Sequence, residues 1–473
     1  MSSLTEGRAL NIACVSHAES GHMNPIMLIA EGLAERGHHV KLITQSFGAA
    51  KYEKKAQQFG ATFVGLPVQL AESEIHNKAK GAPFMVIRDS MKPSLLAALK
   101  AAPPDVIVGD FTTLAAGEVA HELGVPFVTN VAGSLELIMT LLRFQRVDNM
   151  IGFGGFGLCW SPFRIEGMAA MLNLGNLGTL TKDIVESLAK GSLVLINSFF
   201  GLDEITTLPP FIKLVGPLAP ASEGVDLSGT HPELHEFLSD ARDVVYITTG
   251  TMVILEEWLV KVLFKAMKLA GCRVVWSLKE DCHKFIPSLD DPAFFISSWL
   301  PQPALLCHPK VKAVVTHCGW GGSIECTQGG KPVLALPFFA DQPCNAKMLL
   351  KSGMAEPLGP MPSFSLDHTG RGCYKPGSLN AQAMAKTVKK ILEDEKYARA
   401  AQRVQSLSKG AGLGRTAVCE HIESAAIIGV KHLCNGDQVR AMTRHTPAVV
   451  SVALLAIAAS VLAVVAKAKR GSR

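Results

Sequence analysis

Short apolar runs alternate with longer amphipathic runs along most of this chain, and that alternation limits the possible folds more than any other feature. The run ALNIACV (9–15) has the length of a buried strand, and the residues after it place apolar side chains at helical spacing up to Gly37. The next apolar run is HHVKLIT (38–44). A strand, a helix and a second strand in this order form a β-α-β unit, which indicates a parallel sheet covered by helices.

The same alternation occurs in two successive parts of the chain. Further apolar runs with the length of strands lie at residues 104–110, 125–130, 193–197, 244–250 and 272–278. Residues 216–240 are rich in Pro, Gly and Ser, which is typical of a linker. We therefore predict an α/β protein of two facing doubly wound domains, 1–215 and 241–440, joined by this linker. Ligands of such sheets bind at the carboxyl ends of the strands.

The composition excludes several classes of protein. Of the 473 residues 48% are hydrophobic and 18% charged, which is typical of a globular chain and not of a disordered one. The net charge is +5 and the basic residues form no stripe interleaved with aromatics, so we expect no nucleic-acid partner. The 11 cysteines are odd in number and form no C-x-x-C pair, so we expect reduced, mostly buried thiols and no zinc site.

An uncharged apolar segment, AVVSVALLAIAASVLAVVA, occupies residues 448–466. As a helix it would be about 28 Å long, close to the thickness of a bilayer core. The start of the chain lacks the basic and apolar regions of a secretory signal. We therefore expect a single-pass C-terminal membrane anchor with the body in the cytosol, at the endoplasmic reticulum. Basic residues between 467 and 473 favour the opposite orientation, and Arg440 and Arg444 partly balance them.

The segment 140–185 is rich in Gly, Met and Phe, and its stretch GFGGFG (152–157) matches the pattern G-x-G-x-x-G. No strand leads into this stretch and Pro162 interrupts the residues after it, so the pattern does not predict dinucleotide binding. We interpret the segment as an apolar loop on the substrate side of the first domain.

Residues 299–345 gather glycines and polar side chains at the expected carboxyl ends of two strands. Glycines at the start of a helix let backbone N–H groups approach phosphate oxygens, whose charge is favourable at that end of the helix dipole. Trp299 offers a flat face for a base, and Glu325 can accept hydrogen bonds from a diol. Asp341 can hold sugar hydroxyls. Each residue alone has another interpretation: His317 and Trp299 as core residues, and Asp341 as a helix N-cap.

The ordered set WLPQ…THCGWGGSIE…GGKPVLALPFFADQ, within residues 299–342, resembles the donor-binding signature of the UDP-glycosyltransferases, the UDP-sugar-dependent family of plants and animals. The stretches INSFFGLDE (196–204), LVGPL (214–218) and ITTGT (247–251) resemble further landmarks of that family, so the resemblance covers roughly residues 9–430. It implies two Rossmann-like domains of the GT-B type, inversion at the sugar carbon, and a reaction that needs no metal and no cofactor besides the UDP-sugar.

The resemblance also assigns roles by position. Uracil would stack on Trp299, and the ribose would be held by Gln302 and Glu325. The diphosphate would be contacted by His317, by Thr251 and by the backbone from Gly319 to Ser323, and the sugar would be faced by Trp320, Asp341 and Gln342. The complete set of candidate donor-binding residues is Thr251, Trp299, Gln302, His317, Gly319, Trp320, Gly321, Gly322, Ser323, Glu325, Asp341 and Gln342. Plant members usually carry Asn-Ser after HCGW, whereas this chain carries Gly321-Gly322. One side-chain contact to the phosphates is therefore lost, and Ser323 or backbone amides would replace it.

His22 and Asp110 are the candidate catalytic residues. Sugar transfer by direct displacement needs a base for the acceptor hydroxyl, and a histidine held by a carboxylate suits that role. His22 follows the first strand and Asp110 ends a neighbouring one, and both match the family's catalytic pair by position. The alternative is that each caps a helix. We interpret the nearby His17 as an ordinary loop residue.

The sequence thus predicts an enzyme that moves a hexose, most consistent with glucose, from a UDP-sugar to a hydroxyl of a lipophilic small molecule such as a sterol or terpenoid. The choice of glucose rests on the family analogy at Gln342, and the apolar acceptor on the anchor and the Phe/Met/Leu-rich segment. The alternative is a non-catalytic nucleotide-sugar-binding membrane subunit that recruits or regulates a partner enzyme. Such a subunit would not need His22 and Asp110.

Overall fold

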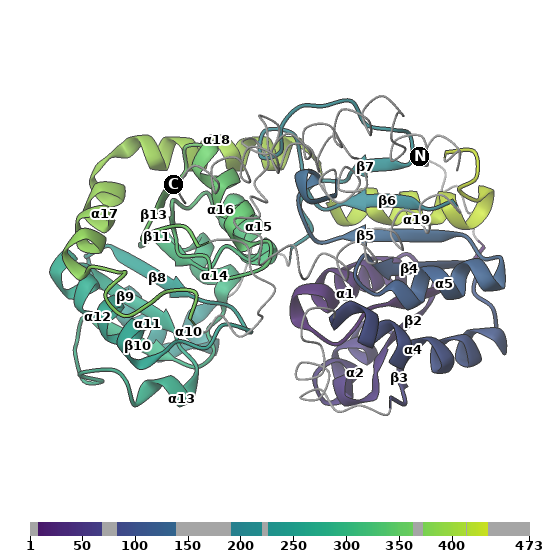
Figure 1. Ribbon diagram of the computed structural model, residues 1–473, viewed down its shortest axis with the longest axis horizontal. Coiled ribbons are helices and arrows are strands. Elements are labelled where there is room, and N and C mark those ends of the chain that lie inside the picture. The colour runs from purple at the N-terminus through teal and green to yellow at the C-terminus, as the bar shows by residue number, and fades with distance from the viewer. Residues whose placement is uncertain are drawn as a thin grey trace, which may run out of the picture.

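The computed structural model of the chain describes residues 8–68, 83–138, 191–219, 226–362, 372–412 and 414–433. These residues form two α/β domains that lie side by side, each built on a parallel sheet with helices on its faces (Figure 1). The predicted α/β class and the two doubly wound domains are confirmed.

The sheet of the first domain has seven parallel strands in the order β3-β2-β1-β4-β5-β6-β7. The strands are β1 (Asn11–Val15), β2 (His39–Gln45), β3 (Thr62–Leu66), β4 (Val106–Asp110), β5 (Phe127–Val131), β6 (Leu193–Ile196) and β7 (Ile212–Leu214). The strand order reverses between β1 and β4, so the carboxyl ends of these two strands form the switch point where ligands bind in such sheets.

The sheet of the second domain has six strands in the order β10-β9-β8-β11-β12-β13, all parallel. The strands are β8 (Val244–Thr248), β9 (Arg273–Ser277), β10 (Phe294–Ser297), β11 (Val311–Thr316), β12 (Val333–Ala335) and β13 (Ala355–Pro357). Here the switch point lies between β8 and β11, and the glycine-rich stretch predicted to bind the donor comes directly after β11.

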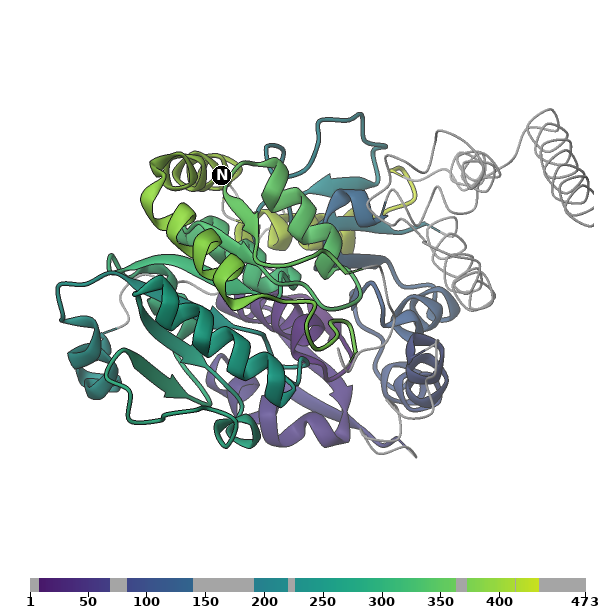
Figure 2. The ribbon, with the colours of Figure 1, turned by 60° about the vertical axis from the view of Figure 1, so that its left-hand side comes forward.

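Helices cover both faces of each sheet (Figures 1 and 2). In the first half of the chain they are α1 (Ser20–Glu35), the short 3₁₀ turn η1 (Ser46–Gly48), α2 (Ala49–Gln58), α4 (Pro83–Lys100) and α5 (Leu114–Leu123). In the second half they are α10 (Leu227–Thr230), α11 (Pro232–Leu238), α12 (Glu257–Ala270), α13 (Glu280–His283), α14 (Gln302–Cys307), α15 (Trp320–Gly329), α16 (Gln342–Lys351), α17 (Ala381–Glu393), α18 (Glu395–Gly410) and α19 (Gly414–Ile428). Glycine ends several of them. Gly124 and Gly271 take the left-handed conformation directly after α5 and α12, as C-terminal caps require.

The structure corrects the predicted domain boundaries at two places. Residues 226–240 are not a bare linker, because α10 and α11 bury Leu227, Leu234 and Leu238 in the core of the second domain. Helix α19 belongs to the first domain, because it packs on α1, β4 and β5 and buries apolar residues such as Ile422 in the core of that domain (Figure 1). The periodicity of such a helix does not specify the sheet against which it packs.

Among the described residues, two stretches between the domains run side by side. Residues 216–219 lie beside Ala411, Gly412 and Gly414, and glycines allow the close approach. A Cβ atom on Gly216 would lie 3.3 Å from the carbonyl oxygen of Gly412, and one on Gly414 would collide with the carbonyl oxygen of Pro217.

No helix among the residues described is long and apolar enough to cross a membrane. The predicted anchor at 448–466 and the glycine-rich stretch at 152–157 both lie outside the described residues.

Candidate functional site

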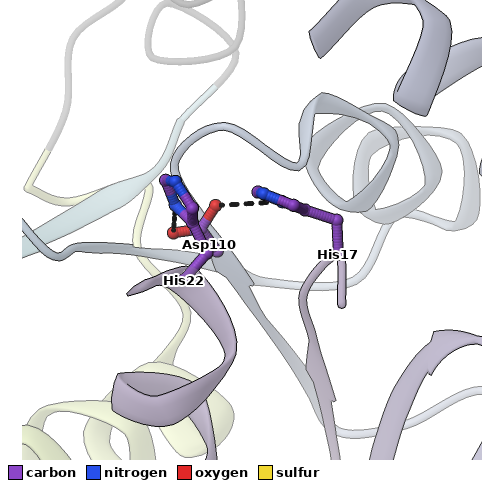
Figure 3. A group of neighbouring side chains, drawn as sticks. All are labelled: His17, His22 and Asp110. Carbon is purple, nitrogen blue, oxygen red and sulfur yellow. Dashed lines mark hydrogen bonds and ion pairs between the residues drawn. The ribbon is translucent and has the colours of Figure 1, made fainter. Parts of the chain in front are cut away.

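The proposed catalytic pair forms at the switch point of the first sheet. His22 lies in the first turn of α1 and Asp110 is the last residue of β4, and the Nδ1 atom of His22 lies 3.0 Å from Oδ1 of Asp110 (Figure 3). The Asp110 side chain is fully buried, whereas that of His22 is 21% exposed. This arrangement leaves Nε2 of His22 as the ring nitrogen available to a substrate.

The second oxygen of Asp110 is held by the turn after β4. The backbone N–H of Thr112 donates to Oδ2 at 3.0 Å, and the Thr112 hydroxyl donates to the same oxygen at 2.5 Å. The capping alternatives fail, because Glu19 and Thr113 occupy the N-cap positions of α1 and α5. Asp110 is thus a carboxylate fixed by its own loop and aimed at His22.

His17 completes this cluster, and sequence reasoning missed it. It does lie in a loop, but its side chain is only 1% exposed, and its Nδ1 atom lies 3.1 Å from the Thr113 hydroxyl and 3.8 Å from Oδ2 of Asp110 (Figure 3). The rings of His17 and His22 are 4.4 Å apart. The feature of the sequence that could have indicated this cluster is the pair His17 and His22, five positions apart, after a strand that ends at the switch point.

The donor atoms of His17, His22 and Asp110 lie within 4.8 Å of one another, which raises the question of a metal. The Thr112 hydroxyl lies among them, 2.5 Å from Asp110, 3.2 Å from His22 and 3.5 Å from His17. The position that an ion would need is therefore taken by a hydroxyl group that is already hydrogen bonded. The cluster therefore suits proton transfer better than it suits metal binding.

Opposing effects set the charge of the pair. Burial disfavours the imidazolium of His22, but the charge and hydrogen bond of Asp110, with smaller effects of Glu19 and Asp341, outweigh it and raise the pKa of His22 to about 9. Burial works against the carboxylate of Asp110 as well, and the charge and hydrogen bond of His22 hold the pKa of Asp110 below its ordinary value. A proton accepted by His22 is therefore strongly stabilised.

The two domains face each other at this point, because Asp341 belongs to the second domain and its charge still acts on His22. Asp341 stands at the N-cap position of α16, yet its side chain makes no capping hydrogen bond, so the capping interpretation is wrong. Its carboxylate accepts a hydrogen bond from Asn345 at 2.6 Å, and burial raises its pKa.

His317 lies directly after β11 and is held between two glycines. A Cβ atom on Gly250 would lie 2.5 Å from Nε2 of His317, and one on Gly319 would collide with the same atom. His317 is partly exposed and therefore not a core residue. Burial lowers its pKa to about 4, so at neutral pH the ring is an uncharged group that can donate a hydrogen bond without carrying a positive charge.

Two non-glycine residues next to these side chains have left-handed backbone. Cys318 has φ 61° and comes after His317, and Ala340 has φ 52° and precedes Asp341. Such conformations cost about 1–3 kcal/mol and concentrate at functional sites. Asn345 connects the two turns, since its amide donates to the carbonyl oxygen of Cys318 at 3.0 Å and also to Asp341.

The start of α15 is open to a ligand. Gly319 is its N-cap, and a side chain at Gly321 would meet nothing within 4 Å. The hydroxyl of Ser323 and the indole nitrogen of Trp320 are buried and have no hydrogen-bond partner within the described part of the chain. Free backbone N–H groups beside an unpaired hydroxyl suit an anionic ligand.

The predicted ribose and base positions lie on the neighbouring elements. The Gln302 amide donates to the carboxylate of Glu325 and accepts from the Tyr246 hydroxyl at 3.1 Å. Trp299 is 68% exposed, which excludes the core interpretation, and it stacks on His231 at 5.7 Å. Thr251 is exposed in the turn after β8.

Gln342 differs from the expectation of a side chain that reaches a sugar. It is 4% exposed, and its side-chain oxygen accepts the N–H groups of Phe338 and Phe339 at 2.9 and 3.3 Å. The side-chain oxygen of Gln342 therefore stabilises the loop before α16. Its amide nitrogen is the side-chain atom that could still bind a ligand.

Comparison with known proteins decides the family. Residues 70–411 match the family described as UDP-glucoronosyl and UDP-glucosyl transferase. This chain belongs to that family. The resemblance predicted from the sequence is confirmed.

Two curated relatives illustrate the family. A UDP-glycosyltransferase of Talaromyces amestolkiae is 29% identical over 49% of this chain and 45% of its own length. An anthocyanidin 3-O-galactosyltransferase of Rhododendron delavayi is 27% identical over 54% of this chain and 62% of its own length. The matched part thus spans about half to three fifths of these two relatives.

Among solved structures, a UDP-glucose: anthocyanidin 3-O-glucosyltransferase in complex with UDP superimposes with a TM-score of 0.69. It is 17% identical, and the match covers 89% of this chain and 99% of that one. At this identity the likeness shows the fold alone, and it confirms the GT-B arrangement of two Rossmann-like domains in this chain.

Proposed function

We propose that this protein transfers a hexose, glucose, from a UDP-sugar to a hydroxyl group of a lipophilic small molecule such as a sterol or terpenoid, with inversion at the sugar carbon. The observation that carries the proposal is the hydrogen-bonded pair of partly exposed His22 and buried Asp110, which faces Asp341 of the donor-side domain across the domain boundary.

In the proposed reaction, Nε2 of His22 takes the proton of the acceptor hydroxyl as the acceptor oxygen bonds to C1 of the sugar. The bond from C1 to the diphosphate breaks on the opposite side, and UDP leaves with the electron pair. Asp110 stabilises the imidazolium that forms, as the raised pKa of His22 indicates. The hydrogen bond between them also fixes the tautomer in which Nε2 is free.

The donor domain would stabilise the leaving UDP without a metal. The start of α15 offers backbone N–H groups and the buried Ser323 hydroxyl to the diphosphate, and His317 adds an uncharged donor. Gly321 and Gly322 leave this backbone uncovered, which suits a diphosphate held by N–H groups in place of the missing side chain. Glu325 and Gln302 would exchange their mutual hydrogen bond for the two ribose hydroxyls.

Fewer observations bear on the identity of the acceptor than on the donor. Two of the curated relatives are named as an anthocyanidin 3-O-galactosyltransferase and a flavonol 3-O-glucosyltransferase. The apolar segment around 134–160 and the predicted anchor at 448–466 favour an acceptor that partitions into membrane. We propose that the anchor holds the body at the cytosolic face of the endoplasmic reticulum.

The full chain, purified in mild detergent, tests the proposal. UDP release is measured with UDP-glucose, UDP-galactose and UDP-glucuronate against a sterol, a terpenoid alcohol and a flavonol, with and without EDTA. We expect release that depends on both substrates, is fastest with UDP-glucose and an apolar alcohol, and is unaffected by EDTA. Tight UDP binding with no release in any combination would instead favour the non-catalytic subunit.

The anchor needs its own measurement. Membrane sedimentation is compared between the full chain and a variant that stops after Arg440. Pelleting of the full chain and release of the truncated chain support the anchor, whereas equal pelleting of both would exclude it.

A further inference from the structure

Trp299 has an aromatic neighbour, His231, to which the proposed function assigns no role. The two ring centroids lie 5.7 Å apart and the ring planes differ by 28°, which is a stacked arrangement. Trp299 is 68% exposed, whereas His231 is partly buried. An indole with both faces covered could not be exposed to this extent. His231 therefore covers part of one face of the indole and leaves the other open to a flat ligand.

The fold brings His231 to the edge of the sheet where the donor is proposed to bind. Helix α11 packs on β9 and β10, since the ring of Phe237 lies 5.6 Å from that of Phe295 and 3.7 Å from the guanidinium carbon of Arg273. Arg273 begins β9 and donates to the carbonyl oxygen of Phe237 at 2.5 Å, so the end of α11 lies at the amino edge of the sheet. The start of α11, next to His231, therefore lies at the carboxyl edge, beside Trp299.

Hydrogen bonds hold the imidazole of His231 in place. The Thr230 hydroxyl donates to the carbonyl oxygen of Asp226 at 2.7 Å and lies 2.9 Å from Nδ1 of His231. Because its own proton is already donated, the hydroxyl accepts the Nδ1–H of the imidazole. The backbone N–H of His231 donates to Leu227, which is buried in the core of the second domain. The ring thus stands on a short helical segment that is anchored in that core.

The indole of Trp299, by contrast, is too exposed for the protein core to hold its plane. Its carbonyl oxygen accepts a hydrogen bond from the Ser297 hydroxyl at 2.9 Å, which fixes the backbone and not the side chain. Exposed side chains change rotamer within picoseconds to nanoseconds, and a ligand that must order such a ring binds more weakly. Contact with a fixed imidazole reduces this loss.

We propose that His231 is a positioning residue for the donor, which backs the indole of Trp299 so that its open face receives the uracil of UDP. The base does not enter between the two rings. It would need about 3.5 Å on each side, or about 7 Å in all, and the rings are 5.7 Å apart. The order is therefore imidazole, indole and then base, with His231 acting through Trp299.

This role rests on the proposed function, because it takes Trp299 as the surface on which uracil stacks. Calorimetry on the full chain in mild detergent measures the Kd for UDP in the wild type, His231→Ala and His231→Phe. Loss of the ring contact should weaken UDP binding by about 2- to 10-fold in His231→Ala. Phenylalanine restores a flat ring, so His231→Phe should bind UDP within about twofold of the wild type. The side chain of His231 makes no capping hydrogen bond, so neither substitution removes a cap of α11.

Inorganic diphosphate and a second histidine serve as controls. Diphosphate has no base, so its binding should be equal in all three proteins. His235 lies one turn further along α11 and is exposed, and His235→Ala should bind UDP like the wild type. Unchanged UDP binding in His231→Ala, equal weakening of UDP and diphosphate, or no rescue by phenylalanine would each overturn the proposal. Tighter UDP binding in His231→Ala would also overturn it, because the imidazole would then compete with uracil.

Trp299→Ala separates failure of this role from failure of the proposed function. Loss of the stacking surface should weaken UDP binding by about fivefold or more. If Trp299→Ala weakens binding and His231→Ala does not, only the role of His231 is wrong. If Trp299→Ala binds UDP like the wild type, the proposed base site is wrong as well.

Discussion

Gly250→Ala tests how the donor site holds His317. The wild-type glycine has φ 69°, and a Cβ atom there would lie 2.5 Å from Nε2 of His317, too close for both groups to keep their places. The left-handed conformation would cost an alanine about 1–2 kcal/mol in unfolding free energy. The collision would also turn the imidazole away from the proposed diphosphate. A lost hydrogen bond to a charged group corresponds to about 1.5–3 kcal/mol, or roughly 10- to 150-fold in Kd for UDP.

Gly271→Ala is the matched control. This glycine lies in the same domain with φ 74°, and its Cβ would meet nothing within 4 Å. Urea unfolding should show a similar loss of stability for both variants, whereas calorimetry should show weaker UDP binding for Gly250→Ala alone. If both variants bind UDP like the wild type, His317 does not contact the diphosphate.

The remaining predictions concern the catalytic pair and the ribose site. His22→Ala should lower turnover by about 100- to 10,000-fold while the Kd for UDP stays within about twofold, and normal turnover would exclude His22 as the base. Glu325→Gln should weaken UDP binding by about tenfold or more in calorimetry but leave the binding of uracil alone unchanged, since it removes an acceptor for the ribose. The folded pKa of His22, about 9, exceeds its unfolded value, so His22 contributes stability below about pH 6.5 that is lost as pH rises through 9. The stability difference between the wild type and Asp110→Asn should therefore shrink by up to about 3 kcal/mol over that range in urea titrations, and a constant difference would contradict the coupling.

Much of the fold could be predicted from the sequence because parallel strands here are continuous apolar runs, bounded by helices that end at glycine. The run ALNIACV and Gly37 are examples, since β1 spans Asn11–Val15 and Gly37 has φ 87° after α1. The return of α19 to the first domain could not be predicted, because an amphipathic helix does not specify which sheet covers its apolar face.

The candidate site, too, could be predicted from the sequence only in part. The motif order located the pair His22 and Asp110, and the structure brings the two side chains within hydrogen-bonding distance. His17 was missed because two histidines five positions apart after a strand do not show which of the two side chains is buried in the loop. For Gln342 the motif gave the position of the residue but not the direction of its side chain. The side-chain amide points into the protein because its oxygen accepts the N–H groups of Phe338 and Phe339, and the sequence does not specify that loop conformation.

The return of α19 has a consequence for how the protein is made. The core of the first domain includes Val418, Ile422 and Ala425, which are synthesised after the whole second domain. At about 5–20 residues per second, translation from the end of β7 to the end of α19 takes on the order of tens of seconds. During that time α1 and strands β4 and β5 lack the helix that covers them and expose apolar surface. The first domain to be synthesised is thus the last to be completed, and a nascent chain stalled within the second domain should bind chaperones through the first.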